Sequence, residues 1–369
     1  MAHDNLFESV KMGTQTLKNR IIMAPLTRLR AVEPGDVPTA LAGEYYSQRA
    51  GAGLVITEAT QVSFQAKGYA GAPGIHTEDQ TVAWKVIVDN VHAKGGKIVA
   101  QLWHTGLVAH DSVQPEGKAP ISASDVDVGA RTSLRDSDNQ AIRVEATPPR
   151  PASLDEIRQV IKDFAHATKC AKQAGFDGVE VHGAHGYLLH QFWVEQTNKR
   201  DDNYGGSKEN RARLTLEVVD ACIDAWDNDH VGIRVSPQGS FNGVEAGYDE
   251  DNNIWMIEQL NERGLMYLHL SEPDWAGGTP YNDGFRQRIR DAFDNMIIAA
   301  GGYDADKAER NVKAGYIDAV AFGRDYIANP DLAERIRAGK PLNEQHPQTF
   351  YGGGTKGYTD YPFLDEKQA

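Results

Sequence analysis

The sequence predicts an α/β protein of the (β/α)8 TIM-barrel class, with an N-terminal hairpin and a long insertion after the third strand. Short apolar runs rich in β-branched residues alternate with helical patterns along all 369 residues, as buried parallel strands and their covering helices do. This length is long for an ordinary domain and normal for an elaborated barrel. We therefore expect one barrel domain over residues 1–369.

Eight apolar runs are predicted to be the barrel strands. They are, in chain order, Ile21–Leu26, Leu54–Ala59, Lys97–Trp103, Gly178–His182, Val231–Ser236, Tyr267–Ser271, Met296–Gly301 and Ala319–Gly323. Eight strands separated by helices favour a closed parallel barrel. The alternative is an open doubly wound sheet. Against it, no Gly-x-Gly-x-x-Gly motif follows the first strand, and Pro25 stands where that turn would be.

Two helices have the clearest periodicity. Apolar residues recur three and four positions apart over Leu154–Ala174 and Arg213–Trp226. Ser153 is the expected N-cap of the first helix, and Gly175 is its expected end. Residues 5–18 alternate weakly and are expected to form a hairpin that closes the bottom of the barrel.

Residues 105–150 form the long insertion between the third strand and its helix. The segment is polar and contains several prolines. Within it, Arg131–Leu134 and Ala141–Glu145 flank a turn-like stretch at Asp136–Gln140. A long insertion at the C-terminal end of a strand is usually a lid or a substrate wall, so we expect residues 105–150 to be a lid.

The charge balance limits the possible partners. Lys and Arg total 38 and Asp and Glu total 52, which gives a formal net charge of −14. An acidic surface repels phosphate backbones and argues against nucleic-acid binding. No targeting sequence or membrane-spanning stretch is recognisable. We expect a cytoplasmic monomer whose partners are small electrophilic molecules.

Catalytic groups in such barrels lie at the C-terminal ends of the strands, and the fourth strand is followed by His182, His185 and Tyr187. Two adjacent imidazoles can donate hydrogen bonds to one substrate oxygen. A phenol is protonated near neutral pH and can donate a proton. One alternative is a zinc site, for which no third ligand is clearly placed. The other is that both histidines only satisfy loop carbonyls.

Residues at later strand ends indicate an inward-facing cation and a phosphate site. Arg234 in the fifth strand is expected to face inward, either paired with a barrel carboxylate or beside the N1 and O2 atoms of a flavin. Gly301 and Gly302 end the seventh strand, and Gly323 and Arg324 follow the eighth. Glycine lets backbone N–H groups approach a phosphate, and this is the usual barrel phosphate site.

Several motifs occur in order along nearly the whole chain. They are Met23–Arg28, Glu44–Ala50, Gln101–His104, His182–Leu188, Asn198–Arg200, Tyr204–Ser207, Asn210–Arg211 and Phe350–Gly353. In these motifs the chain resembles the Old Yellow Enzyme family of FMN-dependent ene-reductases. The paired histidines, Ser271–Trp275 and Gly357–Tyr361 are similar to those of bacterial N-ethylmaleimide and pentaerythritol tetranitrate reductases.

The resemblance implies FMN as cofactor, NADPH or NADH as reductant, and a role for each matched residue. The flavin ring would contact Pro25, Leu26, Thr27, Ala59, Gln101, His182 and Arg234. The FMN phosphate would be held by Gly301, Gly302, Gly323 and Arg324. The substrate's electron-withdrawing group would be bound by His182 and His185, and Tyr187 would donate a proton. The substrate pocket would be lined by Tyr69, Trp103, Trp275 and Tyr351, aromatics that ordinary packing would otherwise explain.

The chain departs from the family pattern in two places that bear on substrate range. Leu107 stands where relatives usually carry arginine, and Trp193–Gln196 replaces a more common Leu-x-Pro segment. We expect the loss of a cation at Leu107 to change access at the mouth of the lid segment.

The predicted activity is reduction of activated C=C bonds in enones and maleimides, and of nitro compounds or nitrate esters. A flavin-free lyase or aldolase is one alternative, but none of the eight strand ends has a lysine for a Schiff base. A barrel that only binds ligands is the other. A yellow protein that bleaches with NADPH would exclude both alternatives.

Overall fold

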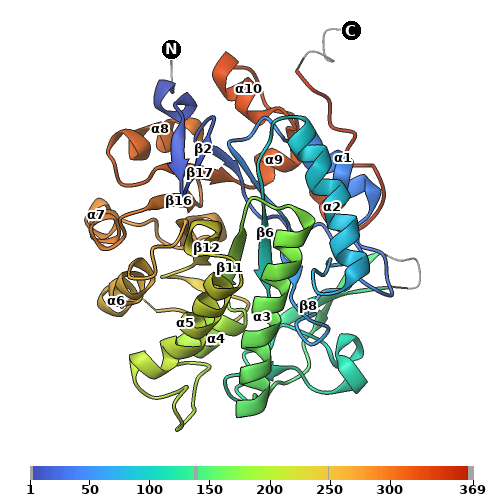
Figure 1. Cartoon of the computed structure of the whole chain (residues 1–369), viewed down its shortest axis with the longest axis vertical. Coiled ribbons are helices and arrows are strands. Elements are labelled where there is room, and N and C mark those ends of the chain that lie inside the picture. The colour runs from blue at the N-terminus through green and yellow to red at the C-terminus, as the bar shows by residue number, and fades with distance from the viewer. Residues whose placement is uncertain (1–2, 137–139, 248, 365–369) are drawn as a thin grey trace.

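The computed structural model describes residues 3–136, 140–247 and 249–364. A closed barrel of parallel strands forms its centre (Figure 1). Its strands are β3 (Ile21–Met23), β4 (Leu54–Ile56), β6 (Ile98–Trp103), β11 (Val179–Gly183), β12 (Val231–Val235), β15 (Tyr267–Ser271), β16 (Met296–Ala300) and β17 (Ala319–Phe322). The pairing of β17 with β3, and of β6 with β11, closes the ring. The predicted barrel is confirmed, and the open doubly wound sheet is wrong.

Helices surround the barrel as an outer layer (Figure 1). They are α1 (Ala40–Gln48), α2 (Glu78–Ala93), α3 (Leu154–Ala174), α4 (Leu188–Trp193), α5 (Lys208–Ala225), α6 (Glu250–Asn261), α7 (Asp283–Ala292), α8 (Ala305–Lys313), α9 (Arg324–Ala328) and α10 (Leu332–Ala338). Neighbours in this layer pack together, α1 on α2, α2 on α3 and α3 on α5. The apolar face of each helix is thereby buried against the strands.

Helix α3 has the predicted bounds because both of its ends are specified by local chemistry. The Ser153 hydroxyl accepts the N–H of Glu156 at 3.2 Å, and the Glu156 carboxylate accepts the N–H of Ser153 at 2.9 Å. This reciprocal capping satisfies donors that the helix leaves unpaired. Gly175 ends the helix with a φ of 87°, which glycine adopts without steric cost. Helix α5 begins earlier than predicted, at Lys208, because the Ser207 side chain caps it.

Two barrel strands end three residues earlier than predicted, and four residues beyond their ends line a cavity: Ala24, Pro25, Leu26 and Ala59. The first strand stops at Met23 rather than Leu26, and the second stops at Ile56 rather than Ala59. Proline has no N–H to extend a ladder, so Pro25 ends the first. The chain beyond these ends remains buried or half-buried and turns across the top of the barrel.

The bottom of the barrel is covered by the predicted hairpin of β1 (Val10–Met12) and β2 (Gln15–Leu17). The side chains of Met12 and Leu17 are fully buried and pack in one apolar cluster with inward-facing barrel residues, among them Ile22, Leu54 and Val99. The hairpin therefore closes the end of the barrel away from the expected active site, as predicted.

The insertion after β6 forms small strands of its own. Strands β7 (Ile121–Ser122) and β10 (Arg150–Pro151) pair in parallel, and β8 (Arg131–Arg135) pairs antiparallel with β9 (Ala141–Glu145). The two predicted extended stretches are confirmed as the β8–β9 hairpin. The predicted turn at Asp136–Gln140 includes residues 137–139, which lie outside the described residues. The remaining short strands are β5 (Thr60–Gln61), β13 (Ser240–Phe241) and β14 (Val244–Glu245).

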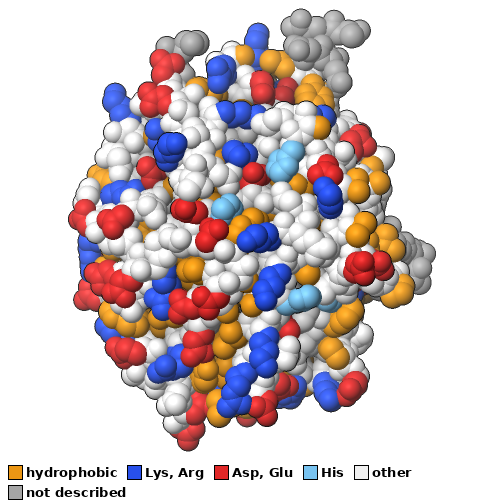
Figure 2. Space-filling view, viewed as in Figure 1, with side chains coloured by type: hydrophobic (Ala, Val, Ile, Leu, Met, Phe, Trp, Pro, Cys, Tyr) orange, Lys and Arg blue, Asp and Glu red, His pale blue; other side chains and the backbone are white. Residues whose placement is uncertain are grey.

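Acidic and basic side chains are interspersed on the molecular face shown in Figure 2. No helix among the described residues has the length and apolar character needed to cross a membrane.

Candidate active site

A cavity of about 520 Å³ opens at the C-terminal ends of the barrel strands. Nearly all residues predicted to contact FMN line it, although they come from strands far apart in the sequence. These are Pro25, Leu26, Thr27, Ala59, Gln101, His182, Arg234, Gly301, Gly323 and Arg324. The volume is within the range of small-molecule and cofactor sites. Gly302 is the one predicted FMN contact that is absent from this lining.

A fully buried polar layer lies beneath the cavity. Glu180 accepts a hydrogen bond from Gln101 Nε2 at 2.7 Å through one carboxylate oxygen, and the other oxygen lies 2.8 Å from His269 Nδ1. Burial acts to raise the pKa of the Glu180 carboxyl, but His269, the charge of Arg234 and the hydrogen bond from Gln101 together hold that pKa below its usual range. The sequence did not indicate Glu180 or His269 as site residues. The available signal was a histidine within the apolar run Tyr267–Ser271.

Arg234 lies beside this layer without a carboxylate of its own. It pairs in register with His182 on β11 and with His269 on β15. No carboxylate in the described chain comes within 4.0 Å of its guanidinium, and its buried Nε has no hydrogen-bond partner. Burial lowers the pKa of Arg234, yet an arginine stays protonated near neutral pH. A buried cation that faces a cavity requires an anionic or polar acceptor, and reduced flavin would supply one.

Three of the four residues predicted to hold the FMN phosphate lie at one end of the cavity. Gly301, Gly323 and Arg324 line the cavity. The N–H of Gly302 instead donates to Asp274 Oδ1 at 2.7 Å, and Lys307 Nζ donates to the other oxygen of that carboxylate at 2.7 Å. In this structure Gly302 is therefore engaged with Asp274, and the open cradle is formed by the other three residues.

The turn after β11 brings His182, His185 and Tyr187 to one side of the cavity. The His182 ring centroid lies 5.4 Å from that of His185 and 5.0 Å from that of Tyr187. His185 has a φ of 59° and Gly186 a φ of 75°, so both occupy the left-handed region. A Cβ at residue 186 would collide with the backbone oxygen of Phe241, which explains the glycine.

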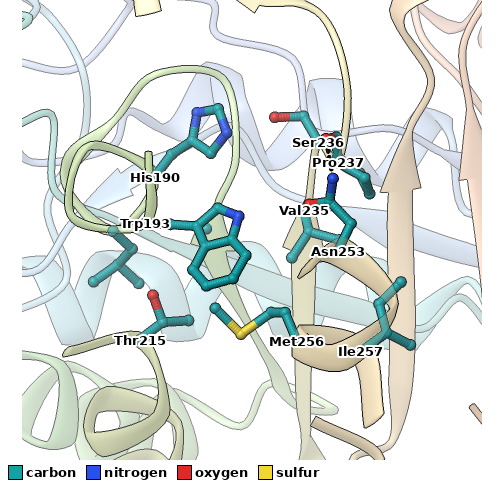
Figure 3. Close-up of a pocket in the computed structure, with 11 residues that line it drawn as sticks. His190, Trp193, Thr215, Val235, Ser236, Pro237, Asn253, Met256 and Ile257 are labelled. Carbon is teal, nitrogen blue, oxygen red and sulfur yellow. Dashed lines mark hydrogen bonds between the residues drawn. The ribbon is translucent and has the colours of Figure 1, made fainter. Parts of the chain in front are cut away.

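Three hydrogen bonds fix the backbone of this turn at His185 and Gly186. The N–H of His185 donates to Ser236 Oγ at 3.0 Å, and the N–H of Gly186 donates to His190 Nδ1 at 2.9 Å. Asn242 Nδ2 donates to the carbonyl of His185 at 3.0 Å. Figure 3 shows Ser236 and His190 at the edge of a separate cavity of about 20 Å³. That space holds about one water, so it serves packing beneath the turn rather than ligand binding.

Burial sets the protonation of all three groups. Removal from water, reinforced by the charge of Arg234, holds the pKa of His182 and of His185 well below 6.5. Both rings are therefore neutral near pH 7. Burial raises the pKa of Tyr187 well above 10, and the neighbouring Tyr69 adds to this shift. The site thus presents neutral imidazoles and a neutral phenol.

A second cavity of about 650 Å³ continues from the first toward solvent. Five residues line both spaces: Thr27, His185, Tyr187, Trp275 and Tyr351. Tyr69 lines the outer space, and its hydroxyl lies 3.3 Å from that of Tyr187. Trp103 lines neither space. It is fully buried behind Tyr187, with ring centroids 5.0 Å apart.

Leu107 does not lie at the mouth of the site, which corrects the expectation from the sequence. Its side chain is 2% exposed and belongs to an apolar cluster with Trp103 and Val108. Segment Trp193–Gln196 does bear on the outer cavity. Gln196 bonds the backbone of Gly243 and Glu245 and so supports the β13–β14 hairpin, which carries three outer-cavity residues: Ser240, Phe241 and Asn242.

Substitution Leu107→Arg is therefore expected to destabilise the protein rather than retune its substrates. A guanidinium in this apolar cluster would cost about 2 kcal/mol or more of unfolding free energy. Urea unfolding measures this, and Leu342→Arg, at a residue 41% exposed, is the matched control. Unchanged stability with shifted KM values would restore the original expectation.

Among the described residues, no three His, Cys, Asp or Glu side chains are grouped as metal ligands. Fold and site together define the class: a barrel oxidoreductase with a cavity suited to a flavin. The family model of the NADH:flavin oxidoreductase / NADH oxidase family matches residues 5–343, and the chain belongs to that family. FMN is accordingly its cofactor.

Comparison with individual proteins agrees with this family. Morphinone reductase is 46% identical, with a TM-score of 0.95 over 100% of this chain and 99% of that chain. The Old Yellow Enzyme homologue from Zymomonas mobilis is 37% identical, with a TM-score of 0.91 over 97% of this chain and 99% of that chain. The 12-oxophytodienoate reductase 1 of Oryza sativa subsp. japonica is 44% identical over 370 residues, which cover 98% of this chain and 93% of that protein. The resemblance to the Old Yellow Enzyme family is confirmed, while the finer likeness to N-ethylmaleimide and pentaerythritol tetranitrate reductases stays a prediction.

Proposed function

We propose that this flavin oxidoreductase reduces activated C=C bonds of enones and maleimides with electrons from NADPH or NADH. The observation that carries the proposal is that two neutral imidazoles, a phenol and the buried guanidinium of Arg234 line one cavity. Nitro compounds and nitrate esters are further substrates of the same site, because they also present oxygen atoms to paired donors. A solved structure of morphinone reductase contains tetrahydroNAD, which supports a reduced nicotinamide as the electron source.

The residues that line the cavity would hold FMN, which would supply hydride-transfer chemistry between the reduced nicotinamide and the β-carbon of the substrate. Arg234 would stabilise negative charge on bound flavin, because it is a buried cation that lines the cavity and has no carboxylate within 4.0 Å among the described residues. Gln101, which Glu180 holds at 2.7 Å, borders the flavin with its orientation fixed. Coenzyme and acceptor then occupy the same space in turn.

His182 and His185 bind the substrate's carbonyl or nitro oxygen. Each is neutral, so each acts as a hydrogen-bond donor through its one N–H. As hydride reaches the β-carbon, negative charge grows on that oxygen, and preorganised donors stabilise it more strongly than they do the ground state.

Tyr187 donates the proton that completes the reduction at the α-carbon. Its pKa well above 10 keeps the phenol protonated until a carbanion-like centre forms nearby. The Tyr69 hydroxyl, 3.3 Å away, lines the outer cavity and offers a route for reprotonation. One hydride and one proton together saturate the double bond.

The β8–β9 hairpin of segment 105–150 forms one wall of the substrate path. Ser133, Ala141 and Arg143 from this hairpin line the outer cavity. This placement supports the lid role expected for the insertion.

The direct test is spectroscopic. The purified protein should be yellow, should bleach anaerobically with NADPH or NADH, and should regain its colour when an enone or N-ethylmaleimide is added. A colourless protein would favour the lyase or binding-barrel alternatives. A yellow protein that bleaches but is reoxidised only by oxygen would contradict ene reduction.

The phosphate cradle yields a prediction about FMN retention. Arg324→Ala should weaken FMN binding about 10- to 100-fold, because it removes a charge-assisted contact to phosphate. Dissociation is followed by flavin fluorescence during dialysis, and heat-released flavin should migrate as FMN rather than FAD. Arg310→Ala, which removes the same charge from an exposed position on α8, should retain FMN normally. Equal retention in both variants would show that Arg324 makes no phosphate contact.

A further inference from the structure

Ser271 is the last residue of the barrel strand β15, and its side chain contacts His185, one of the two histidines that line the cavity. Its side chain is fully buried, and its Oγ lies 2.7 Å from His185 Nε2 and 3.3 Å from Trp275 Nε1. We propose that Ser271, oriented by Trp275, fixes the tautomer of His185 so that Nδ1 carries the proton and donates it toward the substrate oxygen. This positioning role deepens the proposed function and rests on it.

The direction of the two hydrogen bonds follows from which groups can donate. An indole N–H is only a donor, so Trp275 donates to Ser271 Oγ. The Ser271 hydroxyl has one hydrogen, and His185 Nε2 is the only acceptor within reach of it in the described structure. When Ser271 donates to Nε2, all three groups are satisfied. In the opposite arrangement His185 donates, and a fully buried serine hydroxyl hydrogen has no partner, which costs free energy.

The choice of tautomer decides whether His185 can bind substrate at all. The ring is neutral near pH 7, because burial and Arg234 hold the pKa of His185 well below 6.5. A neutral imidazole has one donor nitrogen and one acceptor nitrogen. His185 Nδ1 has no protein partner in the described structure, so it is the nitrogen left for a ligand. If Nε2 carried the proton, Nδ1 would present a lone pair to the ligand and would repel a carbonyl oxygen.

His182 is also a neutral imidazole with one N–H available to the substrate, but a different contact fixes its tautomer. Its Nδ1 accepts the N–H of Ala184 at 3.2 Å, which leaves the proton on Nε2. A backbone amide therefore orients His182, and the Ser271 hydroxyl orients His185. Two N–H donors then face one cavity, as binding of a single oxygen requires.

The rest of the His185 environment fixes its position but not its proton. Ser236 and Asn242 hold its backbone. The Phe241 ring lies 4.8 Å away and the Trp275 ring 5.7 Å away, centroid to centroid, and both pack against the imidazole. None of these contacts distinguishes the two nitrogens, so the tautomer depends on Ser271.

The first test measures the tautomer directly in the oxidised FMN-bound enzyme. Two-bond ¹H–¹⁵N correlation spectra of ¹⁵N-histidine-labelled protein distinguish the two neutral forms, and His185→Gln assigns the signal. Wild type should show the proton on Nδ1, and Ser271→Ala should show a mixture. A proton on Nε2 in wild type would overturn the proposal, whatever the enzyme's substrates prove to be.

The second test measures binding of a phenol, whose charge-transfer band with oxidised flavin reports occupancy of the site. Ser271→Ala should raise the Kd for the phenol about 3- to 10-fold, since one oriented hydrogen bond is lost. Ser271→Thr should restore binding, and Trp275→Phe should weaken it less than Ser271→Ala does.

The control is Ser112→Ala, which removes an exposed serine hydroxyl 2.8 Å from His110 Nδ1 in a segment that lines neither cavity. It should leave phenol binding unchanged. If wild type reduces enones but Ser271→Ala binds phenol as tightly as wild type, the positioning role is wrong and the proposed function stands. If wild type shows the Nδ1 tautomer but reduces no enone, the proposed function fails and the tautomer assignment stands.

Discussion

Tyr187→Phe is expected to slow oxidation of the reduced enzyme by a simple enone about 10²- to 10⁴-fold, the usual contribution of general acid catalysis. Reduction of the flavin by NADPH requires no such proton and should be nearly unchanged. The ring remains to pack against Trp103 and His182, whose centroids each lie 5.0 Å from that of Tyr187, so the substitution removes the hydroxyl and little else. Anaerobic stopped-flow traces of the two half-reactions measure both rates.

Substrate chemistry provides an internal control for this result. Nitrate esters need no protonation at carbon, so Tyr187→Phe should reduce them at the wild-type rate. Tyr69→Phe breaks the 3.3 Å contact between the two hydroxyls and should have a smaller effect than Tyr187→Phe. Equal slowing of both half-reactions would indicate structural damage. An unchanged rate with simple enones would show that water or another group supplies the proton.

The sequence was sufficient for the parts of the fold that local chemistry specifies. The bounds of α3 were predicted exactly because a capping pair begins it and Gly175 ends it. The eight barrel strands were predicted from the alternation of short apolar runs with helical patterns along the chain. The ends of β3 and β4 were misplaced because the residues after each strand, 24–26 and 57–59, stay buried or half-buried although the strand itself has ended.

The site was predictable where it follows strand ends and not where it depends on contacts across the barrel. His182, Arg234 and the glycines were found because the C-terminal ends of barrel strands converge. The Glu180–His269 contact joins residues far apart in the sequence, and the Ser271–His185 contact does the same. Such pairs depend on the register between strands and on side-chain direction. The burial of Leu107 was missed because several members of its apolar cluster, such as Leu29 and Val244, are far from it in the sequence.

His182→Ala is expected to lower kcat/KM for an enone about 10²- to 10³-fold, the usual cost of removing one preorganised donor from a developing oxyanion. The spectrum and FMN content should change little, because Gln101, Arg234 and the phosphate cradle remain. The matched control is His92→Ala, an exposed histidine on α2 that pairs with Asp177. A chelator should have no effect on wild type. Loss of activity with the chelator would instead support the zinc interpretation of the paired histidines.

The pH dependence of the same reaction tests whether the donors are neutral. Because the pKa of His182 and of His185 lies well below 6.5, raising the pH through 6.5 removes no proton from either ring. The rate of oxidation of reduced enzyme by a non-ionising enone should therefore be flat between about pH 6 and 8. If the histidines acted as imidazolium ions of ordinary pKa, near 6.5, the rate would fall as the pH rises across that interval. A fall of this kind, absent in His182→Ala, would show that a charged histidine rather than a neutral donor binds the substrate oxygen.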